Sequence, residues 1–248
     1  MRYIHKQPEP EVLKKWKEAQ TSQGLSLLYD IFPDKKRLND ILRQEQHNIC
    51  CYCQRRIEHF QTPLRGGSHN EHLYPENRPN DPQSIARQTD YDNIFACCID
   101  SRGQKSSMQY CGEAKHNSII PELIKDTHCS DYFRYNNLGE IIPNGEYLQW
   151  ADYVKHCASL TGVVADAYEC IRTLNLNAIP LVLFRNEVRE RFITMAKGLD
   201  VSKLKDFIAS YQSAPTFQEL LDMKLQLMRQ RVAVLEEKEN IKLEFEYE

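Results

Sequence analysis

The sequence lacks long hydrophobic runs, a strong net charge and an apolar leader, and each absence excludes a class of protein. Its apolar stretches, such as Ala178–Phe184, are far shorter than the roughly 20 residues of a membrane-spanning helix. No apolar run follows the first basic residues, so we expect a cytoplasmic protein without a membrane partner. The net charge of −3 excludes a protein that coats nucleic acid through bulk charge, but not one with a local contact site.

The composition is that of a folded chain in a reducing compartment. Hydrophobic residues make up 41% of the 248 positions and charged residues 27%, which excludes a disordered chain. The length permits one large domain or two small ones and a core that needs no disulfides. In the expected compartment, the nine cysteines are metal ligands, core fillers or catalytic thiols rather than disulfide partners.

Pattern and composition divide the chain into three parts and predict an α+β fold. An N-terminal helical arm, residues 1–46, contains helices over Pro10–Gln20 and from Pro33–Asp34 to Gln46. Residues 47–145 form a small domain that is rich in turn signals, with strand-like runs at Ile49–Ile57 and Asn93–Cys98.

The third part, residues 146–248, forms a mostly helical domain. Apolar residues recur there at helical spacing, and we expect helices over 178–197, 200–212 and 216–238. The last eight residues alternate apolar and acidic side chains, a pattern of either a short strand or a frayed tail.

Six of the nine cysteines lie in one 62-residue window of the middle part, from Cys50 to Cys111, which suggests a metal site. Cys50 and Cys53 have the C-x-x-C spacing that lets two thiolates converge on one tetrahedral zinc, at about 2.3 Å each. Cys111 begins a return knuckle, and either Cys97 or Cys98 supplies the fourth thiolate. A redox pair and buried structural cysteines are the alternatives. A structural Zn²⁺ would supply folding energy that a loop-rich segment cannot obtain from its core.

Acidic, imidazole and amide groups accompany these cysteines. Glu71 precedes His72, and an imidazole can take a proton from water while a carboxylate holds a divalent cation against a phosphate. Asn93 can pin a loop or orient a histidine through its amide, and either His116 or Asn117 can face the Glu71–His72 pair. The alternative interpretation is a polar surface loop.

The ordered set of C-x-x-C, Glu-His, Asn before Cys, and C-G-x-x-K-x-N resembles an HNH endonuclease with a zinc-supported ββα-metal core. Further segments resemble the PtuB family, the HNH partners in Septu and retron-linked anti-phage defence. These segments are Arg2-Tyr3-Ile4, Pro8-Glu9-Pro10, Cys51-Tyr52-Cys53-Gln54, Asp90-Tyr91-Asp92-Asn93, Leu174-Asn175-Leu176-Asn177 and Arg185.

The resemblance implies a catalytic role for three residues. His72 takes the position of the general base that activates water. Glu71 takes the position of the acidic ligand of a catalytic Mg²⁺ or Mn²⁺, and Asn93 that of the residue that orients the base.

The resemblance also bears on the two open choices. Many HNH proteins carry a metal ligand directly after the last zinc cysteine, where this chain has Gly112, so the role passes to His116 or Asn117, with Asn117 favoured. Cys98 is preferred over Cys97 because it stands five residues after Asn93, where the pattern puts its cysteine. The implied zinc ligands are thus Cys50, Cys53, Cys98 and Cys111.

The resemblance further implies the partners of a nuclease in anti-phage defence. These are a PtuA-like ATPase of the ABC/SMC type, a DNA or RNA substrate and, in retron systems, a reverse transcriptase with its non-coding RNA and DNA. The main alternative is a zinc-knuckle module that binds nucleic acid or protein without catalysis. A weaker alternative makes one cysteine a catalytic nucleophile.

Overall fold

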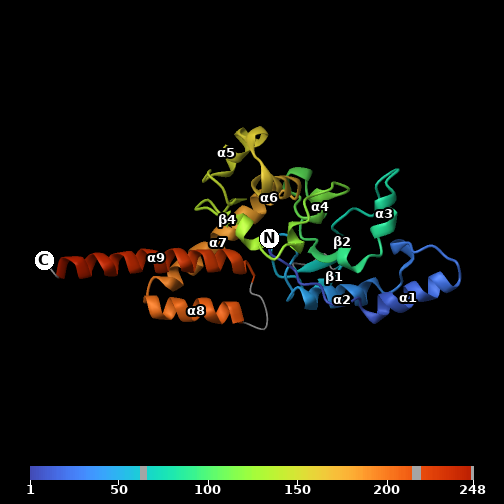
Figure 1. Ribbon diagram of the computed structural model, residues 1–248, viewed down its shortest axis with the longest axis horizontal. Coiled ribbons are helices and arrows are strands. Elements are labelled where there is room, and N and C mark those ends of the chain that lie inside the picture. Colours follow the sequence, from blue (N-terminus) through green and yellow to red (C-terminus); the bar gives the residue numbers. More distant parts are fainter. Residues whose placement is uncertain (62–65, 214–218, 247–248) are drawn as a thin grey trace.

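The computed structural model describes residues 1–61, 66–213 and 219–246, which fold as an α+β protein (Figure 1). The helices are α1 Glu11–Ser22, α2 Lys35–Glu45, α3 Pro82–Arg87, α4 Gly112–Lys115, α5 Trp150–Lys155, α6 Gly162–Thr173, α7 Ile179–Ala196, α8 Val201–Ser213 and α9 Leu221–Glu246. Short 3₁₀ turns are η1 Tyr29–Ile31, η2 Tyr91–Asn93, η3 Ser106–Met108, η4 Leu123–Lys125, η5 Cys129–Tyr132 and η6 Cys157–Ser159. The strands are β1 His59–Phe60, β2 Gly67–His72, β3 Ile94–Cys98, β4 Phe133–Tyr135 and β5 Ile141–Pro143.

Three strands form a small sheet in the order β1-β2-β3. Strand β1 pairs with β2 in parallel, and β2 with β3 antiparallel. Because side chains alternate between faces of a strand, β2 turns Ser68 and Asn70 to one face and His69 and Glu71 to the other. Helix α2 covers the first face, where Asn39 bonds both Ser68 and Asn70.

The second face of the hairpin meets α4, which follows β3 in the chain. A Cβ atom at Gly112, the first residue of α4, would clash with both His69 and Glu71. This face therefore brings the polar end of β2 directly against the start of α4.

Two apolar clusters hold the described residues together. The larger one takes buried side chains from all three predicted parts, including Leu13, Leu42, Phe95 and Leu181. The smaller one joins the end of α7 to α8 and α9, which extend away from the body (Figure 1). The division at residues 46 and 145 stays a prediction. No helix among the described residues has both the length and the apolar character needed to cross a membrane.

Several predicted elements are confirmed with small shifts at their ends. The first two expected helices are α1 and α2, and α2 buries Leu38 and Leu42. The run Asn93–Cys98 is strand β3, and the expected helices 178–197 and 200–212 are α7 and α8. The last expected helix, 216–238, corresponds to α9 from Leu221 onward, and its first three residues lie outside the described part.

Two other predictions are wrong. Ile49–Ile57 is no strand, because its backbone turns at Cys50–Cys53 and only Ile49 and Arg56 pair across that turn. The chain end forms neither a strand nor a frayed tail through Glu246, because α9 extends to that residue. The hairpin of β4 and β5 was not predicted.

Candidate metal centre and adjoining cleft

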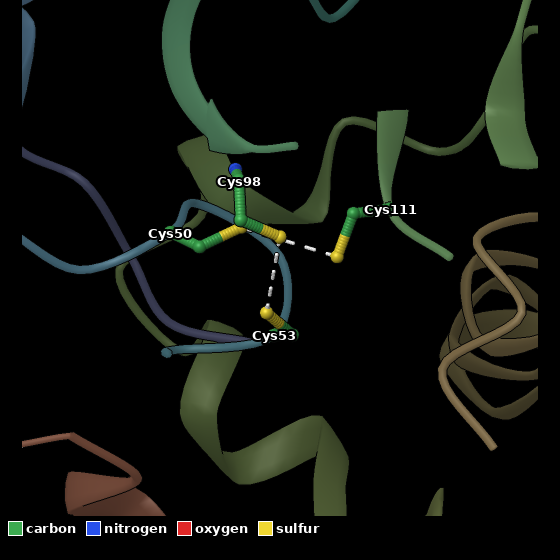
Figure 2. Close-up of side chains that lie close together, drawn as sticks. All are labelled: Cys50, Cys53, Cys98 and Cys111. Atoms are coloured by element: carbon green, nitrogen blue, oxygen red, sulfur yellow. Dashed lines mark hydrogen bonds between the residues drawn. The ribbon is translucent and has the colours of Figure 1, made fainter. Parts of the chain in front are cut away.

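Four cysteines from three separate segments bring their sulfur atoms together (Figure 2). The Sγ atoms of Cys50, Cys53, Cys98 and Cys111 all lie within 4.8 Å of one another. Those of Cys53 and Cys98 are 3.7 Å apart, and those of Cys50 and Cys111 are 3.9 Å apart. Sulfur atoms placed tetrahedrally at about 2.3 Å from one metal lie about 3.8 Å from each other. The group can therefore hold a metal such as zinc.

The surroundings of these thiols suit a structural site that is closed to water. All four side chains are buried. Burial raises the pKa of Cys53 and of Cys111 well above the ordinary value, because a buried thiolate loses its hydration. A bound metal would replace those protons and supply the missing charge compensation.

Local backbone geometry explains how the knuckles form. Gln54 adopts a left-handed conformation with φ of 61°, which closes the first turn, and the amide of Cys50 donates to the carbonyl of Arg55. The amide of Cys98 donates to Sγ of Cys50 at 3.4 Å, so β3 anchors the knuckle. Cys111 also has a positive φ, 58°, and its amide donates to the carbonyl of Leu174.

The choice between Cys97 and Cys98 has a structural counterpart. Cys98 belongs to the four-sulfur group, whereas Cys97 lies beside it. The Sγ of Cys97 is 3.8 Å from that of Cys50 and accepts a hydrogen bond from the amide of Gly112. Cys97 thus links the group to the start of α4 and to the polar face of β2.

A cleft of about 230 Å³ opens beside this centre. Four of the predicted catalytic residues line it, namely Glu71, His72, His116 and Asn117. Glu71 and His72 are nearly buried at its base, whereas His116 and Asn117 are exposed. The cleft has the mixture of carboxylate, imidazole and amide groups that phosphodiester chemistry uses.

Glu71 is held as a carboxylate by its neighbours. Its Oε1 lies 3.0 Å from Nζ of Lys115 and accepts from the hydroxyl of Tyr52, and its Oε2 lies 3.2 Å from Nε2 of His69. Burial opposes ionisation, but Lys115 and His69 outweigh it and lower the pKa of Glu71 to about 2.

His72 is held as a neutral imidazole. Its Nε2 lies 2.8 Å from the carbonyl of Gln88, which can only accept, so Nε2 carries the proton and Nδ1 is the acceptor. Nδ1 lies 3.3 Å from Glu76, and the ring meets Tyr29 edge-on at 4.6 Å between centroids. Burial lowers the pKa of His72 to about 4, since the charged ring would lose its hydration.

Asn93 lies outside the cleft and holds the loops that frame it. Its side chain donates to the carbonyls of Tyr74 and Arg87 and accepts from the amide of Tyr74 at 2.7 Å. These contacts fix the turn after His72 and the segment that ends at Gln88, the partner of the imidazole. Asn93 therefore reaches His72 through backbone rather than through a direct contact.

Helix α4 carries neither His116 nor Asn117. It ends at Lys115, because His116 turns to a left-handed φ of 46°, so both residues lie beyond the helix. The residue of this segment that contacts Glu71 is Lys115, which also donates to the carbonyl of His72 at 2.8 Å. Lys115 was not predicted as a site residue, and only its place in the C-G-x-x-K-x-N motif pointed to it.

Comparison with protein-family models and with curated proteins finds no match to this chain. The function must therefore be argued from the site itself.

Proposed function

We propose that this protein is a metal-dependent endonuclease of the HNH type. The observation that carries the proposal is one cleft in which an ionised Glu71 and a neutral His72 lie beside the four-cysteine group. The order β2, β3, α4, with knuckle cysteines before and within it, is the order that a ββα-metal core requires. In this proposal the cysteines hold a structural Zn²⁺.

The side chains of the cleft have the states that such a reaction needs. His72 is uncharged at neutral pH, and its Nδ1 can take a proton from an attacking water. Glu71 is ionised, and Lys115 and Tyr52 hold one of its oxygens so that the other can bind a cation. A bound Mg²⁺ or Mn²⁺ would neutralise the phosphate and stabilise the leaving oxygen. His116 and Asn117 at the rim are available to contact that cation or the substrate.

We also propose, on the resemblance to PtuB proteins, a PtuA-like ATPase as the partner and anti-phage defence as the setting, with a retron reverse transcriptase where such a system encodes one. The α8–α9 pair is our candidate docking site, because it packs with the end of α7 in an apolar cluster outside the main core. Asp222 in the first turn of α9 bonds both Arg2 and Gln54, next to the first knuckle. A partner bound to this pair would therefore contact a helix that is hydrogen-bonded to residues beside the first knuckle.

The proposal is tested with plasmid DNA and total RNA, using the zinc-loaded protein together with its ATPase and Mg²⁺ or Mn²⁺. We expect cleavage of one of the two polymers. His72→Ala should abolish cleavage with zinc content unchanged, whereas His128→Ala, whose side chain is 72% exposed, should cleave normally. Cleavage by His72→Ala at the wild-type rate would refute the assignment of the base. Binding of nucleic acid without cleavage by the wild type would favour a zinc-knuckle binding module.

A further inference from the structure

Side chains of strand β2 occupy the space beside Gly112, the residue directly after the last knuckle cysteine. A Cβ atom at Gly112 would lie 2.5 Å from Oε2 of Glu71 and 2.8 Å from Nε2 of His69. No side chain at this position could coexist with both groups where they now lie. Strand β2 therefore fills, with His69, the space that a ligand on α4 would otherwise use.

His69 and Glu71 converge as two ligands of one ion would. Nε2 and Oε2 are 3.2 Å apart, close to the separation of adjacent ligand atoms around a cation at about 2.1 Å from each. The side chains are only 14% and 10% exposed. Sγ of Cys97, a ring nitrogen of His69 and a carboxylate oxygen of Glu71 all lie within 4.8 Å of one another.

The groups behind the two atoms hold them in place. Lys115 and Tyr52 hold Oε1 of Glu71, which leaves Oε2 directed at His69. On the far side of the imidazole, Nδ1 lies 2.9 Å from Arg102 and 3.9 Å from Glu113, the carboxylate with which Arg102 pairs. A histidine that binds a metal through one nitrogen commonly donates its other N–H to a carboxylate, and Glu113 can become that acceptor once Arg102 moves aside.

We propose that a divalent transition-metal cation binds between Nε2 of His69 and Oε2 of Glu71, so that His69 replaces the missing ligand of position 112. This deepens the proposed nuclease function, because it assigns the catalytic cation to strand β2 rather than to Asn117. Arg102 now donates to Nδ1, so the ring proton is on Nε2. When the cation binds, Nε2 loses its proton and Nδ1 gains one. The Nδ1–H group then donates a hydrogen bond to Glu113, while Arg102, whose side chain is 49% exposed, turns to solvent.

The ligand chemistry predicts which cation is preferred. Imidazole nitrogen suits first-row transition metals such as nickel or zinc, whereas magnesium takes oxygen ligands and gives up its water reluctantly. Manganese belongs to the same first-row series, so it should accept His69 more readily than magnesium does. We therefore expect the zinc-loaded protein to bind one Mn²⁺ at least tenfold more tightly than Mg²⁺. The His69→Asp variant offers only oxygen ligands, so its affinities for Mn²⁺ and Mg²⁺ should differ less than those of the wild type.

Calorimetric titration of Mn²⁺ into the zinc-loaded protein tests this without any nuclease assay. We expect His69→Ala to weaken binding at least tenfold, and Gly112→Ala to do the same because its methyl group displaces both ligands. The matched controls are His128→Ala and Gly198→Ala, since a Cβ at Gly198 meets nothing within 4 Å. Zinc content and circular dichroism identify any variant that has lost its fold, in which case His69→Asp carries the test.

The outcomes separate this inference from the proposed function. Absence of Mn²⁺ binding in the wild type, or wild-type affinity in His69→Ala, overturns the cation site even if His72→Ala abolishes cleavage. Mn²⁺ binding that depends on His69 in a protein that cleaves no nucleic acid supports the site and refutes the nuclease. An Asn117→Ala variant that loses Mn²⁺ while His69→Ala retains it would assign the cation to the segment after α4 instead.

Discussion

Lys115 provides the sharpest test of the electrostatics of the cleft. Its ammonium is nearly buried and lies 3.0 Å from Oε1 of Glu71, whose pKa is lowered from 4.5 to about 2. A tenfold change in proton affinity corresponds to about 1.4 kcal/mol, so the net lowering, which Lys115 and His69 produce against the effect of burial, corresponds to about 3 kcal/mol of folding free energy. Lys115→Met keeps the volume of the side chain but leaves the carboxylate without its cation. We expect a loss of about 3 kcal/mol at pH 7, in line with other broken buried ion pairs.

The sign of the pH dependence follows from the direction of the shift. A carboxyl group with a lowered pKa in the folded protein stabilises it fully above its ordinary value of 4.5, and this contribution is lost as the pH falls towards 2. A measurement at pH 7 therefore captures the whole effect.

Thermal unfolding of the zinc-loaded protein is the assay, and a loss of about 3 kcal/mol lowers the melting temperature by about 6–12 °C for a chain of this size. The matched control is Lys15→Met, because Lys15 is 75% exposed and pairs with Glu11 on the surface, so a change of at most about 2 °C is expected. Combining Lys115→Met with Glu71→Gln should recover part of the loss. If the stability losses of the two single variants simply add up in the double variant, the ion pair is not the cause of the loss in Lys115→Met.

Three further predictions test the scaffold. Cys53→Ser should reduce zinc from one per chain to near zero by elemental analysis, whereas Cys51→Ser, outside the four-sulfur group, should retain it; equal zinc in both variants would contradict the ligand set. Asn93→Ala removes three hydrogen bonds to loop backbone, so it should cost about 1–3 kcal/mol in thermal unfolding and slow cleavage with zinc unchanged. Asn175 has a φ of 46° and donates to two carbonyls before Cys111, so Asn175→Ala should speed zinc loss to a chelator more than Asn175→Gly, which accepts that backbone. Identical rates for the two would exclude backbone strain.

The elements that could be predicted are those whose burial follows a simple period. Leu38 and Leu42 recur at helical spacing in α2, and the apolar run of β3 is buried on both faces. Strand β2 was not predicted, because its residues, Gly-Ser-His-Asn-Glu-His, show no alternation of apolar and polar side chains. Its two faces are satisfied by hydrogen bonds and an ion pair instead, from Asn39 on one side and Lys115 on the other.

The candidate site divides in the same way. Cysteine spacing and the Glu-His pair were visible, because ligand and acid–base chemistry restrict residue types at short range. The partners of Glu71 were not, because Tyr52, His69 and Lys115 meet it only after the hairpin and α4 pack together. Nothing in the sequence distinguishes Lys115, which is buried, from the many exposed charged residues. Gly112, which looked like a lost ligand, is the residue whose missing side chain admits His69.

We propose that the cleft beside the four-cysteine group cleaves phosphodiester bonds with a cation bound at Glu71. Its most direct test is cleavage of nucleic acid by the reconstituted protein–ATPase complex as Mn²⁺ is raised at constant zinc occupancy, with Glu71→Gln in parallel. We expect no cleavage without Mn²⁺, cleavage that saturates as Mn²⁺ rises, and none by Glu71→Gln at any concentration. Equal cleavage by both proteins, or none by the wild type at saturating Mn²⁺, would contradict it.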